Sequence, residues 1–192
     1  MTLGRILLWF YCLKIEAAIL LMVVSSAIFC FGWSRLENRI FWRRMVFGLL
    51  VMLAAAIIYT TVGNRSVSED VVLKLTPFHS YREVWAGGNP EIYRSNFMNA
   101  ALFYPAGLLL TSLLPNKWHG WGKCVLVVVL LMAMSVGIEY AQYRYGLGDC
   151  EVDDVIHNTA GALAGSVAAL LLPPLLNWIW EKGKIILEKV NT

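Results

Sequence analysis

The sequence predicts an all-α integral membrane protein: a bundle of about five transmembrane helices with a partly helical outer loop and a C-terminal interfacial helix. Its composition is the first reason, because 58% of the 192 residues are hydrophobic and only 15% are charged. Water-soluble domains are about 45–50% apolar and about 25% charged. The second reason is that the apolar residues form long runs, and a run of about 20 crosses a bilayer as a helix.

Five runs are long enough to span: residues 6–33, 45–62, 96–114, 124–142 and 154–176. The first resembles a signal peptide, but Lys14 and Glu16 interrupt it and no cleavage site follows, so we expect a retained span. Pro173 and Pro174 are expected to end the fifth helix. Residues 175–190 alternate apolar residues with lysines, which is typical of a helix lying in the membrane interface.

The distribution of charge predicts the orientation. With the N-terminus outside, the inner segments carry nine basic and three acidic residues, and the outer segments carry six basic and nine acidic residues. The cluster of Arg35, Arg39, Arg43 and Arg44 weighs most in that count. Because basic residues accumulate in cytoplasmic loops, we expect a plasma-membrane protein whose N-terminus lies outside and whose C-terminus lies inside.

One long connection, residues 63–95, is expected to lie outside and to be structured. Residues 71–75 read as a short extended run. Ser80 and Glu83 fit a capping box, so a short helix should begin at Ser80 and stop at Gly87. Asn89 should cap the helix that follows. The loop is either a surface cap over the bundle or a lid over an outward cavity.

Several classes of function are not indicated. The net charge of +3 is not gathered into a basic patch, so we expect no nucleic-acid partner. The four cysteines have no CxxC spacing, so neither a zinc site nor a disulfide framework is expected. Motifs of serine hydrolases, zinc proteases and phosphate-binding loops are absent from the sequence. We therefore expect no metal and no cofactor, and a single domain over residues 1–192.

Polar side chains gather at the junction of the fourth and fifth predicted spans. The candidate functional cluster is Glu139, Gln142, Asp153, Asp154 and Asn158. Ionisable groups at membrane depth are costly and are functional candidates by default. Two plainer explanations stay open: the aspartates begin a helix, where acids cap free N–H groups, and Glu139 with Gln142 could lie in water.

Three motifs carry a resemblance to a known family. They are NAALFYPAG at residues 99–107, LTPF at residues 75–78, and a discontinuous motif that joins Glu139-x-x-Gln142 to DDVIHNTAGALAG at residues 153–165. In combination these resemble the VanZ-like family of small bacterial membrane proteins over residues 65–172. Two positions depart from the family: Lys74 replaces a common Asn, and Gly148 replaces a common Arg.

The resemblance implies a role at the bacterial envelope, since the family's named member is associated with low-level resistance to teicoplanin without remaking of the antibiotic's target. Candidate substrate-binding residues are Asn99, Phe103, Arg144 and His157. In one hypothesis an outward polar site binds a lipid, a cell-wall precursor or the glycopeptide itself. The alternative is an intramembrane enzyme, in which one carboxylate acts as general base on a lipid-linked or glycan substrate. The expected partners include membrane lipids, and the oligomeric state is open.

The fifth span also predicts how the helices pack. Gly161 and Gly165 form a GxxxG motif, which lets a second helix approach closely. We expect that second helix to be the third span, near Asn99 and Pro105. Asn158 would then reach Asn99 or Glu139.

Overall fold

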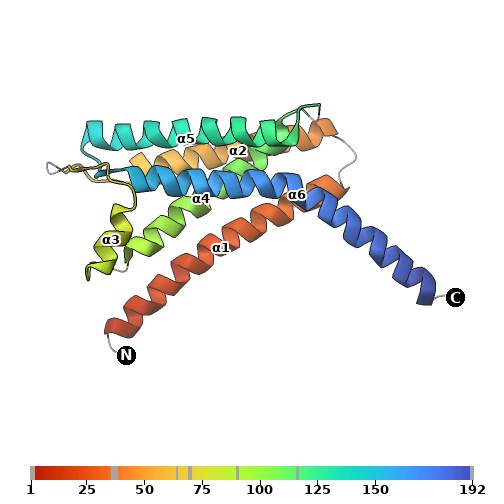
Figure 1. Ribbon diagram of the computed structural model, residues 1–192, viewed down its shortest axis with the longest axis horizontal. Helices are drawn as coiled ribbons and strands as arrows, with labels where there is room; N and C mark the ends of the chain where they lie inside the picture. The colour runs from red at the N-terminus through yellow and green to blue at the C-terminus, as the bar shows by residue number, and fades with distance from the viewer. Residues whose placement is uncertain are drawn as a thin grey trace.

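The structure, a computed structural model, describes residues 3–35, 39–63, 65–68, 71–89, 91–115 and 117–190. It is nearly all α-helical (Figure 1). The elements in chain order are α1 (Leu3–Arg35), α2 (Arg39–Ile58), a π-helical turn η1 (Tyr59–Gly63), β1 (Leu73–Lys74), α3 (His79–Trp85), α4 (Glu91–Leu113), α5 (Gly120–Tyr145), β2 (Cys150–Glu151) and α6 (Val152–Val190). Each of the five predicted spans is a helix.

Four of these helices are long and apolar enough to cross a membrane: α1, α2 with η1, α5 and α6. The helix α4 has 23 residues but is more polar, and most of its second half is buried. It packs against α1, α2, α5 and α6. A helix enclosed by other helices has little contact with lipid, so its sequence can hold polar residues such as Asn96 and Thr111, both buried.

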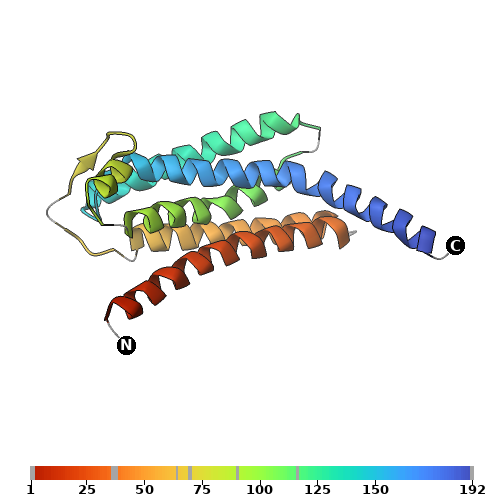
Figure 2. The same cartoon turned by 60° about the horizontal axis from the view of Figure 1, so that its bottom comes forward.

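The most extensive contact among the described helices joins α4 to α6, which lie side by side in Figures 1 and 2. A Cβ atom on Gly161 would stand 1.9 Å from the carbonyl oxygen of Ala100, and one on Gly165 would stand 1.9 Å from that of Tyr104. From the other side, a Cβ on Gly107 would stand 2.1 Å from the carbonyl oxygen of Ala162. The predicted packing of Gly161 and Gly165 on the third span is confirmed.

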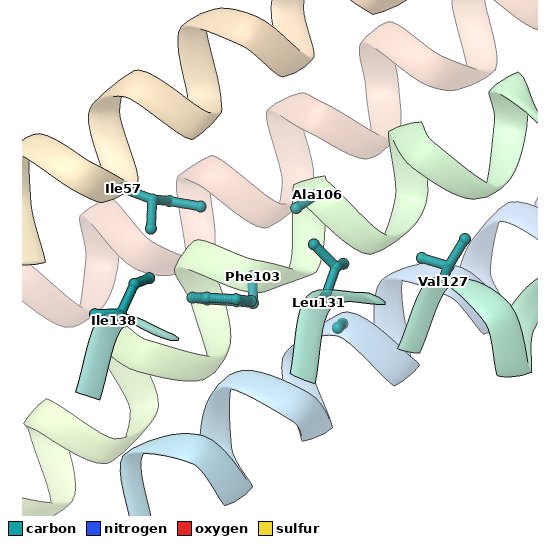
Figure 3. Close-up of a cluster of buried hydrophobic side chains, with 7 residues drawn as sticks. Ile57, Phe103, Ala106, Val127, Leu131 and Ile138 are labelled. Atoms are coloured by element: carbon teal, nitrogen blue, oxygen red, sulfur yellow. The ribbon is translucent and has the colours of Figure 1, made fainter. Parts of the chain in front are cut away.

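A layer of apolar side chains joins α4 to its other neighbours (Figure 3). Phe103 of α4 points toward Ile57 of α2 and Ile138 of α5, and Leu131 and Val127 continue the layer along α5. A second buried cluster around Phe29 and Trp42 joins α1 and α2 to α4. The membrane bundle is therefore held through α4, the helix at its centre.

The predicted end of the fifth span is wrong. Pro173 and Pro174 lie inside α6, which continues to Val190, so residues 175–190 belong to the same helix. Figure 1 shows α6 changing direction along its length, and its C-terminal part leaves the bundle. A proline removes one helical hydrogen bond and clashes with the preceding turn, which can bend a helix without ending it. That the C-terminal part lies in the interface stays a prediction.

The loop between η1 and α4 is structured, as expected, but one detail is wrong. The extended run is present, since β1 pairs in parallel with β2. The short helix stops at Gly87 (φ +93°), and Asn89 caps the start of α4 by accepting the Glu91 N–H at 3.0 Å. However, Ser80 lies inside α3 and does not cap it, because its hydroxyl is bonded to Asp153 of α6.

We predict that Gly161→Leu destabilises the protein. No flexible side chain can move away there, because the added atoms meet the main chain of α4, and overpacking costs about 1–3 kcal/mol or more. The thermal unfolding midpoint in detergent should fall by several degrees. The matched control is Gly137→Leu on α5, where a Cβ has no neighbour within 4 Å. Equal midpoints for the two variants would contradict the contact.

Candidate functional site

Asp153 fastens the long loop to the bundle. It lies in the first turn of α6 and is 2% exposed. Its carboxylate accepts the N–H groups of Phe78 at 2.5 Å and Ser80 at 2.8 Å, and the Ser80 hydroxyl at 2.6 Å. Asn96 of α4 donates to the Ser80 oxygen at 3.0 Å. This one carboxylate therefore stabilises the start of α3 and joins α3, α4 and α6.

The backbone at Phe78 depends on that carboxylate. Phe78 has φ +60°, the left-handed region, which costs energy for a bulky residue. Its N–H points at Asp153, and its carbonyl accepts the N–H of Arg82 at 3.3 Å. Together these contacts hold a turn that the LTPF sequence alone would not favour.

A charged ladder fixes the other side of the loop. Lys74 on β1 lies 2.8 Å from Asp149 and 2.9 Å from Glu151. Partial burial opposes the charge on Lys74, but hydrogen bonds to the two carboxylates outweigh it and hold the pKa of the ammonium above its usual value. The hydrogen bond from Lys74 lowers the pKa of Asp149. The Lys74–Asp149 ion pair thus stabilises the docked loop fully between the usual pKa values of aspartate and lysine. Its contribution is lost as the pH falls through the lowered pKa of Asp149 or rises through the raised pKa of Lys74.

An aromatic contact completes the docking. The Tyr81 hydroxyl and His157 Nε2 are 2.8 Å apart, and the two rings have centroids 5.6 Å apart. The ring of Tyr93 on α4 also contacts that of Tyr81, with centroids 5.6 Å apart and the rings tilted by 50°. His157, a candidate binding residue, is thereby a partner of the loop.

The structure brings Glu139, Asp154 and Asn99 to one place beneath this loop. Glu139 is 4% exposed, and its carboxylate accepts the N–H of Glu151 at 2.9 Å. Asp154 is hydrogen-bonded to the side chain of Asn99. The Arg65 guanidinium acts electrostatically on both carboxylates. Two carboxylates and one cation therefore share the end of the bundle where α4, α5 and α6 meet.

Arg65 occupies the space next to Gly148. A Cβ on Gly148 would stand 2.7 Å from Arg65 Nη1, and Gly148 itself has φ +142°. In the family that the motifs resemble, the position of Gly148 is commonly an arginine. Here the absent side chain leaves room for a guanidinium from another segment. Sequence reasoning missed Arg65, and its only signal was the glycine at 148.

Two buried amides bind neighbouring helices below the cluster. Gln142 is 2% exposed and donates to the Thr61 carbonyl in η1 at 2.8 Å. Carbonyls in a last helical turn lack a helical partner, and Gln142 supplies one. Asn158 donates to the Ser135 hydroxyl of α5 at 2.9 Å, so the expectation that it reaches Asn99 or Glu139 is wrong. Both amides connect helices.

A partly open groove of about 430 Å³ runs beside the cluster. Its lining is Leu73, Leu75, Val136, Glu139, Tyr140, Tyr143, Cys150, Glu151, Val152 and Val155. Most of these side chains are apolar or aromatic, and Val136 is 51% and Tyr140 66% exposed. Glu139 and Glu151 are thus the two carboxylates in an otherwise apolar or aromatic wall, and Glu151 is already paired with Lys74.

Two candidate binding residues lie elsewhere. Phe103 is 1% exposed in the apolar layer and supports the cluster from within the bundle. Arg144 is exposed in the last turn of α5, where a cation stabilises the negative end of the helix dipole. Among the described residues, no three His, Cys, Asp or Glu side chains lie close enough to hold a metal ion.

Comparison with known families agrees with the motifs. A model of the VanZ/LLP1 family matches residues 18–173, which is most of the chain. The chain belongs to the VanZ/LLP1 family. No curated protein and no solved structure matches it. The VanZ/LLP1 match begins well before residue 65, so it takes in most of α1 and all of α2 in addition to the segment that carries the three motifs.

We predict that Asp153→Asn releases the loop. An asparagine offers one oxygen to three donors and turns an N–H group toward at least one of them, and an unmet buried bond costs about 1–3 kcal/mol. Hydrogen exchange at residues 71–89 should quicken, and the unfolding midpoint should fall.

The control is Asp149→Asn, which removes a half-exposed charge whose pair with Lys74 is solvent-screened and is worth about 1 kcal/mol or less. A loop that loosens more in Asp149→Asn than in Asp153→Asn would show that the charged ladder, and not Asp153, holds it.

Proposed function

We propose that this VanZ/LLP1 protein binds the apolar chain of a lipid-like ligand in the groove, with a hydrogen-bond donor of the ligand's head group at Glu139. The groove carries the proposal, because exposed apolar walls beside a buried carboxylate suit a molecule with a hydrocarbon tail and a polar head. Membrane lipids and lipid-linked cell-wall precursors have that construction. So does a glycopeptide with an acyl tail.

The chemistry of the head group follows from the cluster. Glu139, Asp154 and Glu151 place three carboxylates near the Arg65 guanidinium, and of these Glu151 is already bonded to Lys74. An excess of acceptors favours a ligand that donates hydrogen bonds through hydroxyl, amide or ammonium groups. Binding of the acyl tail of teicoplanin, or of the precursor it attacks, would reduce the antibiotic's access to its target without any change in that target.

We propose further that the groove opens on the outer side of the membrane. The support is the charge count, in which the Arg35 to Arg44 cluster lies at the inner end. The helices α4 and α6 would then both run from the outer to the inner side, and α5, which connects them, would run from the inner to the outer side.

Cysteine labelling in intact cells tests the orientation. In a chain whose own four cysteines are serine, Arg82→Cys should react with an impermeant maleimide, and Lys117→Cys should react only after the cells are opened. Both positions are exposed. Ser80 is unsuitable as a reporter because it is buried. The opposite pattern would place the groove on the cytoplasmic side.

Filling the groove tests the binding. Val136→Trp places an indole in the groove at a residue that is already 51% exposed, so the fold should be retained. We expect less co-purified lipid by native mass spectrometry, by about tenfold, since each 1.4 kcal/mol of lost contact is a factor of ten. Any protection against teicoplanin in a susceptible host should be lost.

The matched control is Val129→Trp. Val129 lies two turns away on the same face of α5, is 49% exposed and does not line the groove. It should keep both the bound lipid and the protection. If the two variants lose lipid equally, the groove is not the binding site.

One observation favours a second candidate function, an intramembrane enzyme. Glu139 and Asp154 are neighbouring carboxylates with different partners, a main-chain N–H and an amide. Such a pair can divide the roles of general acid and base. A product mass that appears with the wild-type chain and disappears in Glu139→Gln, while the lipid still binds, would support the enzyme over the binding protein.

A further inference from the structure

A second cavity lies at the other end of the bundle from Glu139. It has a volume of about 530 Å³ and is lined by Ile40, Arg43, Arg44, Phe47 and Leu113. The helix α2 begins here and the helix α4 ends here. The VanZ/LLP1 motifs of the sequence do not include any of the five lining residues, so the cavity is independent of the groove.

Two neighbouring arginines line this cavity. Arg43 and Arg44 are both exposed, and neither forms an ion pair with another residue in the described part of the chain. The first turn of α2 holds no acidic residue, and the positive end of its dipole adds to the charge there. Planar guanidinium groups bind phosphate oxygens through paired hydrogen bonds. The positive charge of the two arginines therefore favours an anionic ligand.

The other lining residues are apolar and suit a hydrocarbon chain. Phe47 is 63% exposed and Ile40 is 66% exposed. Ile40 begins the candidate membrane span Ile40–Gly63 and Phe47 follows two turns later, so we place this end of α2 near the level where lipid phosphates meet the acyl chains. A soluble anion would contact the arginines alone and would make no contact with these apolar side chains.

We infer that this cavity is a binding site for an anionic membrane phospholipid. The phosphate lies between Arg43 and Arg44, and the beginning of an acyl chain lies along Phe47 and Leu113. The lipid bridges α2 and α4, so it stabilises the contact between the centre of the bundle and its second helix.

Phosphatidylglycerol tests the site. The 192-residue chain in mixed micelles of a neutral detergent and phosphatidylcholine is titrated with phosphatidylglycerol, and the unfolding midpoint and the retained lipid are measured. We expect phosphatidylglycerol to raise the midpoint of the wild-type chain. The double variant Arg43→Gln/Arg44→Gln should bind it about tenfold more weakly or worse, through the loss of charged hydrogen bonds. Phe47→Ala keeps both charges and should also weaken binding.

The control variant is Lys182→Gln/Lys184→Gln. It removes two exposed cations from the far end of α6, which are outside the cavity, and should respond to phosphatidylglycerol as the wild type does. Three results would overturn the inference: an unchanged response in the arginine double variant, an equal loss in the lysine double variant, or displacement of the lipid by inorganic phosphate alone. Since Val136→Trp leaves this cavity intact, failure here and failure at the groove are separate results.

Discussion

The approach of two helix backbones, α4 and α6, determines where the polar groups in the first turns of α6 lie relative to α4. Three glycines, Gly107, Gly161 and Gly165, face main-chain atoms of the opposite helix with no space for a Cβ. In a bilayer there is no hydrophobic force between helices, so close backbone contact of this kind is a main source of association. The contact sets the register of α6 on α4. That register brings Asp154 to Asn99 and brings Asp153 to the loop that α4 supports.

The two adjacent aspartates have different tasks because of that register. Asp153 has its oxygens filled by three donors of the loop and is structural. Asp154, the next residue, is rotated by about 100° around the helix axis. It therefore faces Asn99 and the cluster around Glu139. A pair of acids that reads as one motif in the sequence is therefore one anchor and one member of the candidate site.

The sequence predicted the helices and the glycine contact because both depend on local composition. Hydropathy located the spans, and the small residues of α6 showed which face would be approached. Prediction from the sequence failed where a residue far away in the chain determines the local structure. Ser80 fits the sequence pattern of a capping box, but its hydroxyl is hydrogen-bonded to Asp153, which is 73 residues away in the chain. Pro173 and Pro174 were expected to end a helix, but apolar residues on both sides continue it through the bend. Arg65 had no signal of its own, since only the fold places it against Gly148.

Arg65 also shows why the loop and the cluster form one unit. In a chain with an arginine at 148, the cation would belong to the turn between α5 and α6 and would remain beside the carboxylates whatever the loop did. Here the cation comes from the segment before β1, and its position depends on the contacts that fasten that segment, including the bond from Ser68 N–H to the Gly146 carbonyl at 2.7 Å. Release of the loop would withdraw Arg65 and leave Glu139 and Asp154 without this cation at the end of the bundle. Loop docking and the electrostatics of the cluster are thus linked in this chain through a residue that lies outside the shared motifs.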